Sequence, residues 1–103
     1  MVIVETTIFT RLIRELLSDD DYKKFQLALV NRPDMGDLIK GSGGLRKVRW
    51  SLPSGGKRGG IRVIYYWAVD DEQLRMPYVY PKGERENLSS EQLNQLRKIV
   101  SRW

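Results

Sequence analysis

The chain has 103 residues, of which 41% are hydrophobic and 30% charged, and its net charge is +5. This balance is typical of one soluble globular domain, which we expect to span residues 1–103, and it argues against a disordered tail. The sequence contains no cysteine and no histidine, which excludes disulfides, thiolate metal sites and histidine-based acid–base catalysis.

The opening segment, MVIVETTIF, lacks the basic stretch and the continuous apolar stretch of a signal peptide. No apolar run approaches the roughly 20 residues that a membrane-spanning helix requires. We therefore expect a cytoplasmic protein without a membrane partner.

A β-branched run at residues 2–4 predicts a first strand. Behind it, apolar residues such as Ile8, Leu12 and Leu16 recur at helical spacing, with charged residues between them. This pattern predicts an amphipathic helix that ends near Leu17.

A second helix is indicated by Ser18, which three aspartates at 19–21 follow. Serine is a favoured N-cap, and acidic residues in the first turn interact favourably with the helix dipole. The helix should end near Pro33, because the residue before a proline is disfavoured in helical conformation. A helix start explains the aspartates better than a metal site does, and we expect neither a metal nor a cofactor.

From Leu45 the apolar period changes to two, which predicts a strand. Its apolar members share one face: Val48, Trp50 and Leu52. Its polar members share the other: Lys47, Arg49 and Ser51. A loop at residues 53–60 would join this strand to a central strand at 61–69, on which Arg62, Ile64 and Tyr66 share a face.

A third strand is predicted at residues 74–80 after a polar turn at 70–73. Pro77 lies inside this strand and favours either an edge position or a bulge, because proline has no backbone N–H to donate. Ser89, with Gln92 three residues later, forms the signature of a capping box. It opens a C-terminal helix with an apolar stripe: Leu93, Leu96, Ile99 or Val100, and Trp103.

The order of these elements predicts an α+β fold with a mainly antiparallel twisted sheet, two N-terminal helices and one C-terminal helix. We expect the helices to cover one face of the sheet. The other face would then be partly open and would display the charged side chains of the strands.

The positive charge is concentrated in one segment of the chain. Seven basic residues and no acidic one lie between Lys40 and Arg62, which leaves 11 basic and 13 acidic residues elsewhere, a net −2. Lys47, Arg49 and Arg62 would converge on one sheet face, where their mutual repulsion is relieved by a bound phosphate. Tyrosines beside them favour single-stranded RNA, although basic edge strands and solvated hairpin tips produce the same pattern.

Three segments of this sequence together resemble the RelE/ParE superfamily of toxins, most closely its HigB-type branch. They are GGLRKVRW, GGKRGGIRVIYYW and YPKGERENLSSEQLNQL. The resemblance covers nearly the whole chain. It implies a RelE-like fold, a metal-independent mRNA endoribonuclease that works on the 70S ribosome, and a cognate antitoxin of helix-turn-helix, HigA-like type.

The resemblance also implies roles for individual residues. A lysine beside other cations gives up its proton more readily, which suits Lys47 as general base. Arg49 and Arg62 would clamp the phosphate. Lys82 would be a second phosphate contact or the general acid, and Tyr80 and Tyr66 would stack on bases or donate a proton. A last group would grip ribosomal RNA: Arg46, Lys57 and Arg58.

The sequence departs from the family at three positions. Gly83 and Ser89 stand where the RelE branch has an arginine and a tyrosine, and Asn87 stands where HigB-like members have an aspartate. We interpret the change at Asn87 as structural. Two alternatives to the endoribonuclease stay open at this point: a ParE-like inhibitor of DNA gyrase and a non-catalytic RNA-binding module.

Overall fold

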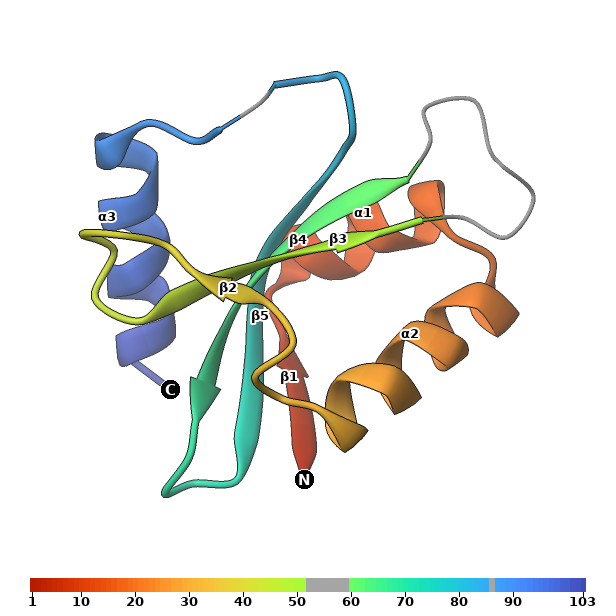
Figure 1. Ribbon diagram of the computed structural model, residues 1–103, viewed down its shortest axis with the longest axis horizontal. Coiled ribbons are helices and arrows are strands. Elements are labelled where there is room, and N and C mark those ends of the chain that lie inside the picture. Colours follow the sequence, from red (N-terminus) through yellow and green to blue (C-terminus); the bar gives the residue numbers. More distant parts are fainter. Residues whose placement is uncertain (52–59, 86) are drawn as a thin grey trace.

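The computed structural model describes residues 1–51, 60–85 and 87–103. In this part of the chain five strands form one sheet, in the order β1-β5-β4-β3-β2, and three helices pack against it (Figure 1). The helices are α1 (Thr7–Leu16), α2 (Asp19–Asn31) and α3 (Ser90–Ser101). The strands are β1 (Val2–Glu5), β2 (Asp37–Leu38), β3 (Leu45–Trp50), β4 (Ile61–Ala68) and β5 (Gln73–Pro81).

Side-chain caps start all three helices. The Thr6 side chain accepts a hydrogen bond from the backbone N–H of Phe9 at 2.9 Å, and the Ser18 side chain accepts one from Asp21 at 3.1 Å. At α3 the predicted capping box is present, with the Ser89 and Gln92 side chains each bonded to the other residue's backbone. The acidic run at 19–21 is therefore a helix start, as the sequence predicts.

Pro77 lies inside the sheet and not at its edge, which corrects one of the two predictions for it. β5 pairs in parallel with β1 and antiparallel with β4. The bulge prediction is confirmed: the register between β4 and β5 shifts between Ile64 and Tyr66. Pro77 also lies one residue beyond the last pair with β1, Glu5 with Met76. Both features remove the need for a ladder hydrogen bond from the proline.

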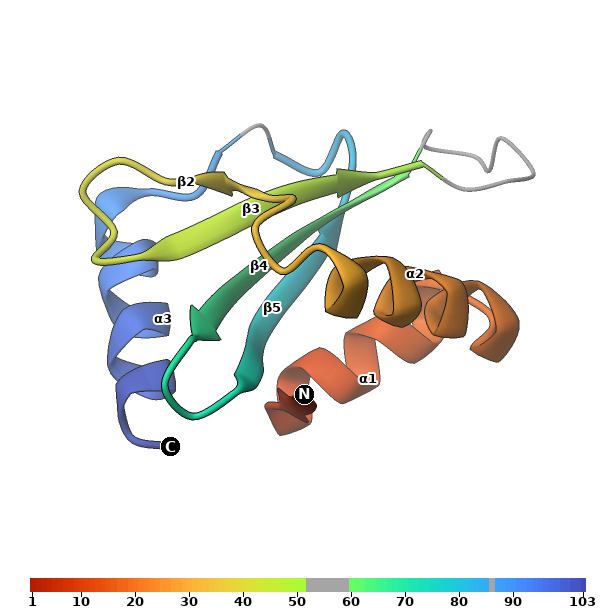
Figure 2. The same ribbon diagram turned by 60° about the horizontal axis from the view of Figure 1, so that its bottom comes forward.

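Helices cover both faces of the sheet, so the expectation that they share one face is wrong. α1 and α2 pack on one face through a buried cluster that includes Phe9, Phe25 and Tyr65. α3 packs on the other face, where its Leu93 and Val100 meet three residues of the sheet: Leu45, Ile64 and Tyr80 (Figures 1 and 2). Strand periodicity shows that the sheet has two apolar faces. It does not show which helix covers each face, because that depends on how the connections between distant segments cross the sheet.

The two-residue strand β2 has no counterpart in the sequence prediction. Both of its residues, Asp37 and Leu38, are exposed, so no alternation of apolar and polar residues marks it. It pairs antiparallel with β3, with Asp37 opposite Lys47. Of the predicted features, Leu52 and the loop at 53–59 lie outside the described residues.

No helix in the described ranges is both long enough and apolar enough to cross a membrane. Within the same ranges, no three His, Cys, Asp or Glu side chains are grouped so that they could hold a metal ion.

Candidate functional site

Two arginines and a tyrosine form a row across three neighbouring strands. Arg49 on β3 lies directly opposite Arg62 on β4, and Arg62 lies directly opposite Tyr80 on β5. Adjacent strands are about 4.8 Å apart and paired residues point to the same face. The register therefore places Arg49 and Arg62 side by side, as the sequence predicts, on the face that α3 covers elsewhere.

Lys47 belongs to the adjacent row on the same face. It lies opposite Ile64 on β4, which in turn lies opposite Tyr78 on β5. Because Lys47 and Arg49 are two residues apart on one strand, their side chains leave the sheet on the same side. Three cations therefore stand within two rows of one sheet face, an arrangement suited to a phosphate because a bound anion offsets their repulsion.

Tyr80 lies beside these cations, directly opposite Arg62 on the neighbouring strand. Its side chain is 1% exposed, and among the described residues its hydroxyl has no hydrogen-bond partner. Burial raises the pKa of Tyr80 above the ordinary phenol value, while the charges of Arg62, Arg85 and Arg49 oppose the rise. The hydroxyl therefore keeps its proton at neutral pH and remains a potential donor.

A small cavity of about 110 Å³ opens beside Tyr80, between the sheet and the start of α3. Its apolar wall consists of Ile39, Ile64, Leu88 and Leu93. Three polar residues complete the lining: Lys47, Tyr80 and Asn87. Across this space the Lys47 Nζ donates a hydrogen bond to the Asn87 Oδ1 at 2.7 Å. The start of α3 is thereby joined to Lys47, beside the row of Arg49, Arg62 and Tyr80, which we call the basic row.

The geometry can be compared with that of known proteins. No protein-family model matches the sequence. Among solved structures, one chain of the intact Escherichia coli RelBE toxin–antitoxin complex superposes with a TM-score of 0.59. The match has 19% sequence identity and covers 82% of this chain and 98% of that chain. This chain has a RelE-like fold.

On this RelE-like fold, Tyr66 lies at the opposite end of the face from the basic row. It is four residues from Arg62 along β4, a separation of roughly 13 Å at about 3.3 Å per residue. The Arg97 guanidinium lies over the Tyr66 ring, 4.6 Å from its centroid, and Gly44 lies so close that a Cβ there would be 2.9 Å from the ring. α3 and the segment before β3 therefore hold the ring that the sequence suggests as a stacking surface.

The other predicted contacts are more widely distributed. Arg46 points to the opposite face of β3, where its Nη1 donates to the backbone carbonyl of Gly36 at 2.8 Å. Lys82 is exposed just beyond β5, as predicted, and its backbone N–H donates to the Gly60 carbonyl at 3.0 Å. Lys57 and Arg58 lie outside the described residues. The structure thus brings together Lys47, Arg49, Arg62 and Tyr80, with Lys82 at the strand end.

Two residues at this site were missed by the sequence reasoning. The charge of Arg85 reaches the Tyr80 phenol, and Asn87 contacts Lys47. The interpretation of the change at Asn87 as structural stays a prediction. Both residues lie in the segment between β5 and α3. The sequence signal that could have found them is their position, because a basic and a polar residue follow Lys82 within five residues.

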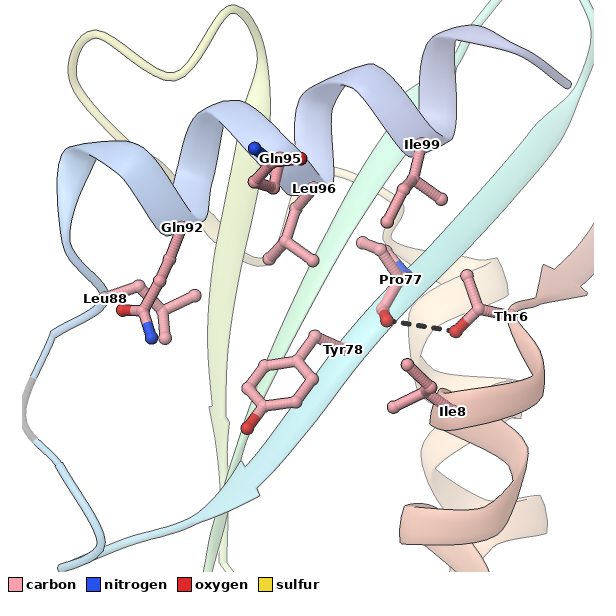
Figure 3. A pocket seen from close by; sticks show the side chains of 9 residues that line it. All are labelled: Thr6, Ile8, Pro77, Tyr78, Leu88, Gln92, Gln95, Leu96 and Ile99. Carbon is pink, nitrogen blue, oxygen red and sulfur yellow. Dashed lines mark hydrogen bonds between the residues drawn. The ribbon is translucent and has the colours of Figure 1, made fainter.

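A larger groove of about 310 Å³ lies between α3, β5 and the start of α1 (Figure 3). Leu96 and Ile99 of α3 face Ile8 and Tyr78 across it, and the Thr6 hydroxyl donates to the Pro77 carbonyl at 3.0 Å. Among the residues that the structure describes, no lysine, arginine, aspartate or glutamate lines this groove. Although this groove is larger than the cavity beside Tyr80, its described lining lacks charged residues that could bind a phosphate. We therefore assign the candidate reaction site to the basic row.

Proposed function

We propose that this chain is the toxin of a type II toxin–antitoxin pair and that it cleaves messenger RNA on the ribosome. The observation that carries the proposal is the row formed by Arg49, Arg62 and Tyr80, with Lys47 beside it on the same sheet face. The RelE-like fold and the resemblance of the three quoted segments to HigB-type toxins support it.

The proposed reaction uses the 2′-hydroxyl of the RNA itself as nucleophile. Lys47, in its neutral form, takes the 2′-hydroxyl proton while the 2′-oxygen forms a bond to the adjacent phosphorus. The bond between phosphorus and the 5′-oxygen breaks, leaving a 2′,3′-cyclic phosphate on one fragment and a 5′-hydroxyl on the other. Arg49 and Arg62 stabilise the charge that builds on the non-bridging oxygens.

The leaving 5′-oxygen must receive a proton, and Tyr80 and Lys82 are our candidate donors. A tyrosine is protonated at neutral pH, and burial raises the pKa of Tyr80 further. Its hydroxyl is covered in the free chain, so it reaches the substrate only after neighbouring side chains shift. Catalytic contacts commonly tighten in this way on substrate binding.

The proposed partners are the 70S ribosome with its message and a cognate antitoxin of HigA-like, helix-turn-helix type. The similarity to a chain of a toxin–antitoxin complex supports the antitoxin. Substrate and partners of this kind place the chain in the cytoplasm. Arg46, Lys57, Arg58 and Tyr66 remain our candidates for RNA and ribosome contact.

Induced expression in a growing bacterium tests the proposal. We expect growth to stop and messages to be cut within codons, and co-expression of a neighbouring helix-turn-helix frame to restore growth. Arg62→Ala should lower the cleavage rate about 100-fold, because it removes a charged donor from the transition state. Primer extension on cellular mRNA measures the cuts.

Arg11→Ala is the matched control, since Arg11 is an exposed arginine on α1, across the sheet from the basic row. It should leave cleavage and toxicity unchanged. Arrested growth with intact messages and lost DNA supercoiling would contradict the proposal and favour a gyrase inhibitor. RNA binding without cuts would favour a non-catalytic module.

A further inference from the structure

The contact between Lys47 and Asn87 joins residues 40 positions apart in the chain. From it we propose that Asn87 is a positioning residue, which holds the Lys47 amine at the mouth of the cavity beside Tyr80. The inference builds on the proposed function, in which Lys47 takes the proton from the nucleophile. Asn87 itself touches no reacting atom.

The backbone around Asn87 is held by the start of α3. Leu88, the next residue, packs against the buried cluster under α3. Ser89 caps the helix, with its backbone N–H donating to the Gln92 side chain at 2.8 Å and its hydroxyl accepting from the Gln92 backbone at 3.1 Å. Since two residues directly after Asn87 are anchored, the amide is presented from a defined place. Lys47 is a long side chain on a strand and gains orientation from this contact.

The chemistry of an amide suits this role. The Asn87 Oδ1 accepts a hydrogen bond from the Lys47 Nζ at 2.7 Å without adding a negative charge of its own. A carboxylate at the same place would favour the ammonium form of the lysine, so an amide and a carboxylate predict different titrations of Lys47. Both side chains line the cavity with the apolar wall, and the contact between them is exposed.

Other charged and titratable groups of the described residues lie near Lys47. Asp37 of β2 lies opposite it, Arg49 and Arg62 stand in the adjacent row, and Tyr80 lines the same cavity. These groups are the same in an Asn87 variant and in the parent chain, so a difference between the two reports the change at Asn87.

The first experiment compares single-turnover cleavage of ribosome-bound message by Asn87→Ala and Asn87→Asp over a range of pH. Asn87→Ala should lower the rate about tenfold or more at saturating ribosome, with little change in the half-saturating concentration, because a base is misplaced while binding is kept. Asn87→Asp should move the acidic limb of the pH–rate profile to higher pH. Asn94→Ala and Asn94→Asp, at an exposed asparagine of α3, should leave rate and profile unchanged.

A second measurement does not depend on cleavage. Side-chain NMR of lysine follows the titration of Lys47, identified by the signal that Lys47→Arg removes. We expect Asn87→Asp to shift that titration to higher pH and Asn94→Asp to leave it in place. An unshifted titration would overturn the positioning role even in an active toxin. A parent chain that cuts no message would overturn the proposed function, while the NMR result would still decide the contact.

Discussion

At the scale of single residues, Tyr80 is the least ordinary group of the site. It is almost fully buried, yet its hydroxyl has no partner among the described residues. A buried hydroxyl without a partner costs stability, so packing alone does not account for a tyrosine where a phenylalanine would fit. The charges of Arg62, Arg85 and Arg49 act on this hydroxyl, which gives it a place in the proposed chemistry.

Tyr80→Phe should therefore separate stability from activity. We expect the free energy of unfolding to stay the same or rise by up to about 1 kcal/mol, because the substitution removes an unsatisfied polar group and keeps the ring. We expect the cleavage rate to fall about 100-fold, as for loss of a proton donor. Urea unfolding measures the free energy of unfolding, and single-turnover cleavage measures the rate. Lower stability would reveal a partner for the hydroxyl, and an unchanged rate would remove Tyr80 from the chemistry.

At the scale of elements, α3 determines which part of the sheet face stays open. In addition to its apolar contacts, α3 is held to the sheet side by hydrogen bonds from two arginines. Arg75 is 6% exposed on β5 and its Nη1 donates to the Val100 carbonyl of α3 at 3.1 Å. Arg97 on α3 donates from Nε to the Gly43 carbonyl at 2.7 Å. Both anchors therefore lie in the C-terminal half of the helix, one to β5 and one to the segment before β3.

Arg75→Ala should loosen the C-terminal end of α3. The change removes the hydrogen bond to Val100 and the ion pair with Asp71, which joins Nη2 to Oδ2 at 2.7 Å. We expect a loss of about 2–3 kcal/mol in the free energy of unfolding, since hydrogen bonds from a buried charged group are lost and a carbonyl is left unpaired. Arg102→Ala, at the exposed C-cap, should change it by less than about 0.5 kcal/mol. Urea denaturation distinguishes the two outcomes; equal losses would contradict the anchoring role.

At the scale of the whole molecule, charge is unevenly distributed. The segment from Lys40 to Arg62 carries +7, and the remaining residues together carry a net −2. Arg49 and Arg62 from this segment lie together on the α3 side of the sheet, whereas α2, on the other side, opens with three aspartates. Such an asymmetry orients a polyanion toward one side of the molecule.

This asymmetry predicts how RNA binding depends on salt. For single strands the logarithm of the association constant falls with the logarithm of salt concentration by about 0.7 per phosphate contact. Arg49→Ala combined with Arg62→Ala should therefore reduce the slope by about 1.4. Lys23→Ala combined with Lys24→Ala, at exposed positions of α2, should leave it unchanged. Fluorescence anisotropy of a labelled single-stranded RNA gives the slopes, and equal effects of the two pairs would show binding without a preferred face.

The sequence by itself determined the helix starts at Ser18 and Ser89, the strand periods, and the set of Lys47, Arg49 and Arg62 on one face. These features depend on residues close together in the chain, where caps and side-chain alternation act. Only the tertiary structure decided that α3 covers the second face, that Pro77 lies inside the sheet, and that Asn87 meets Lys47. Each of these depends on segments distant in sequence, whose meeting is set by the packing of the whole chain and leaves no local pattern.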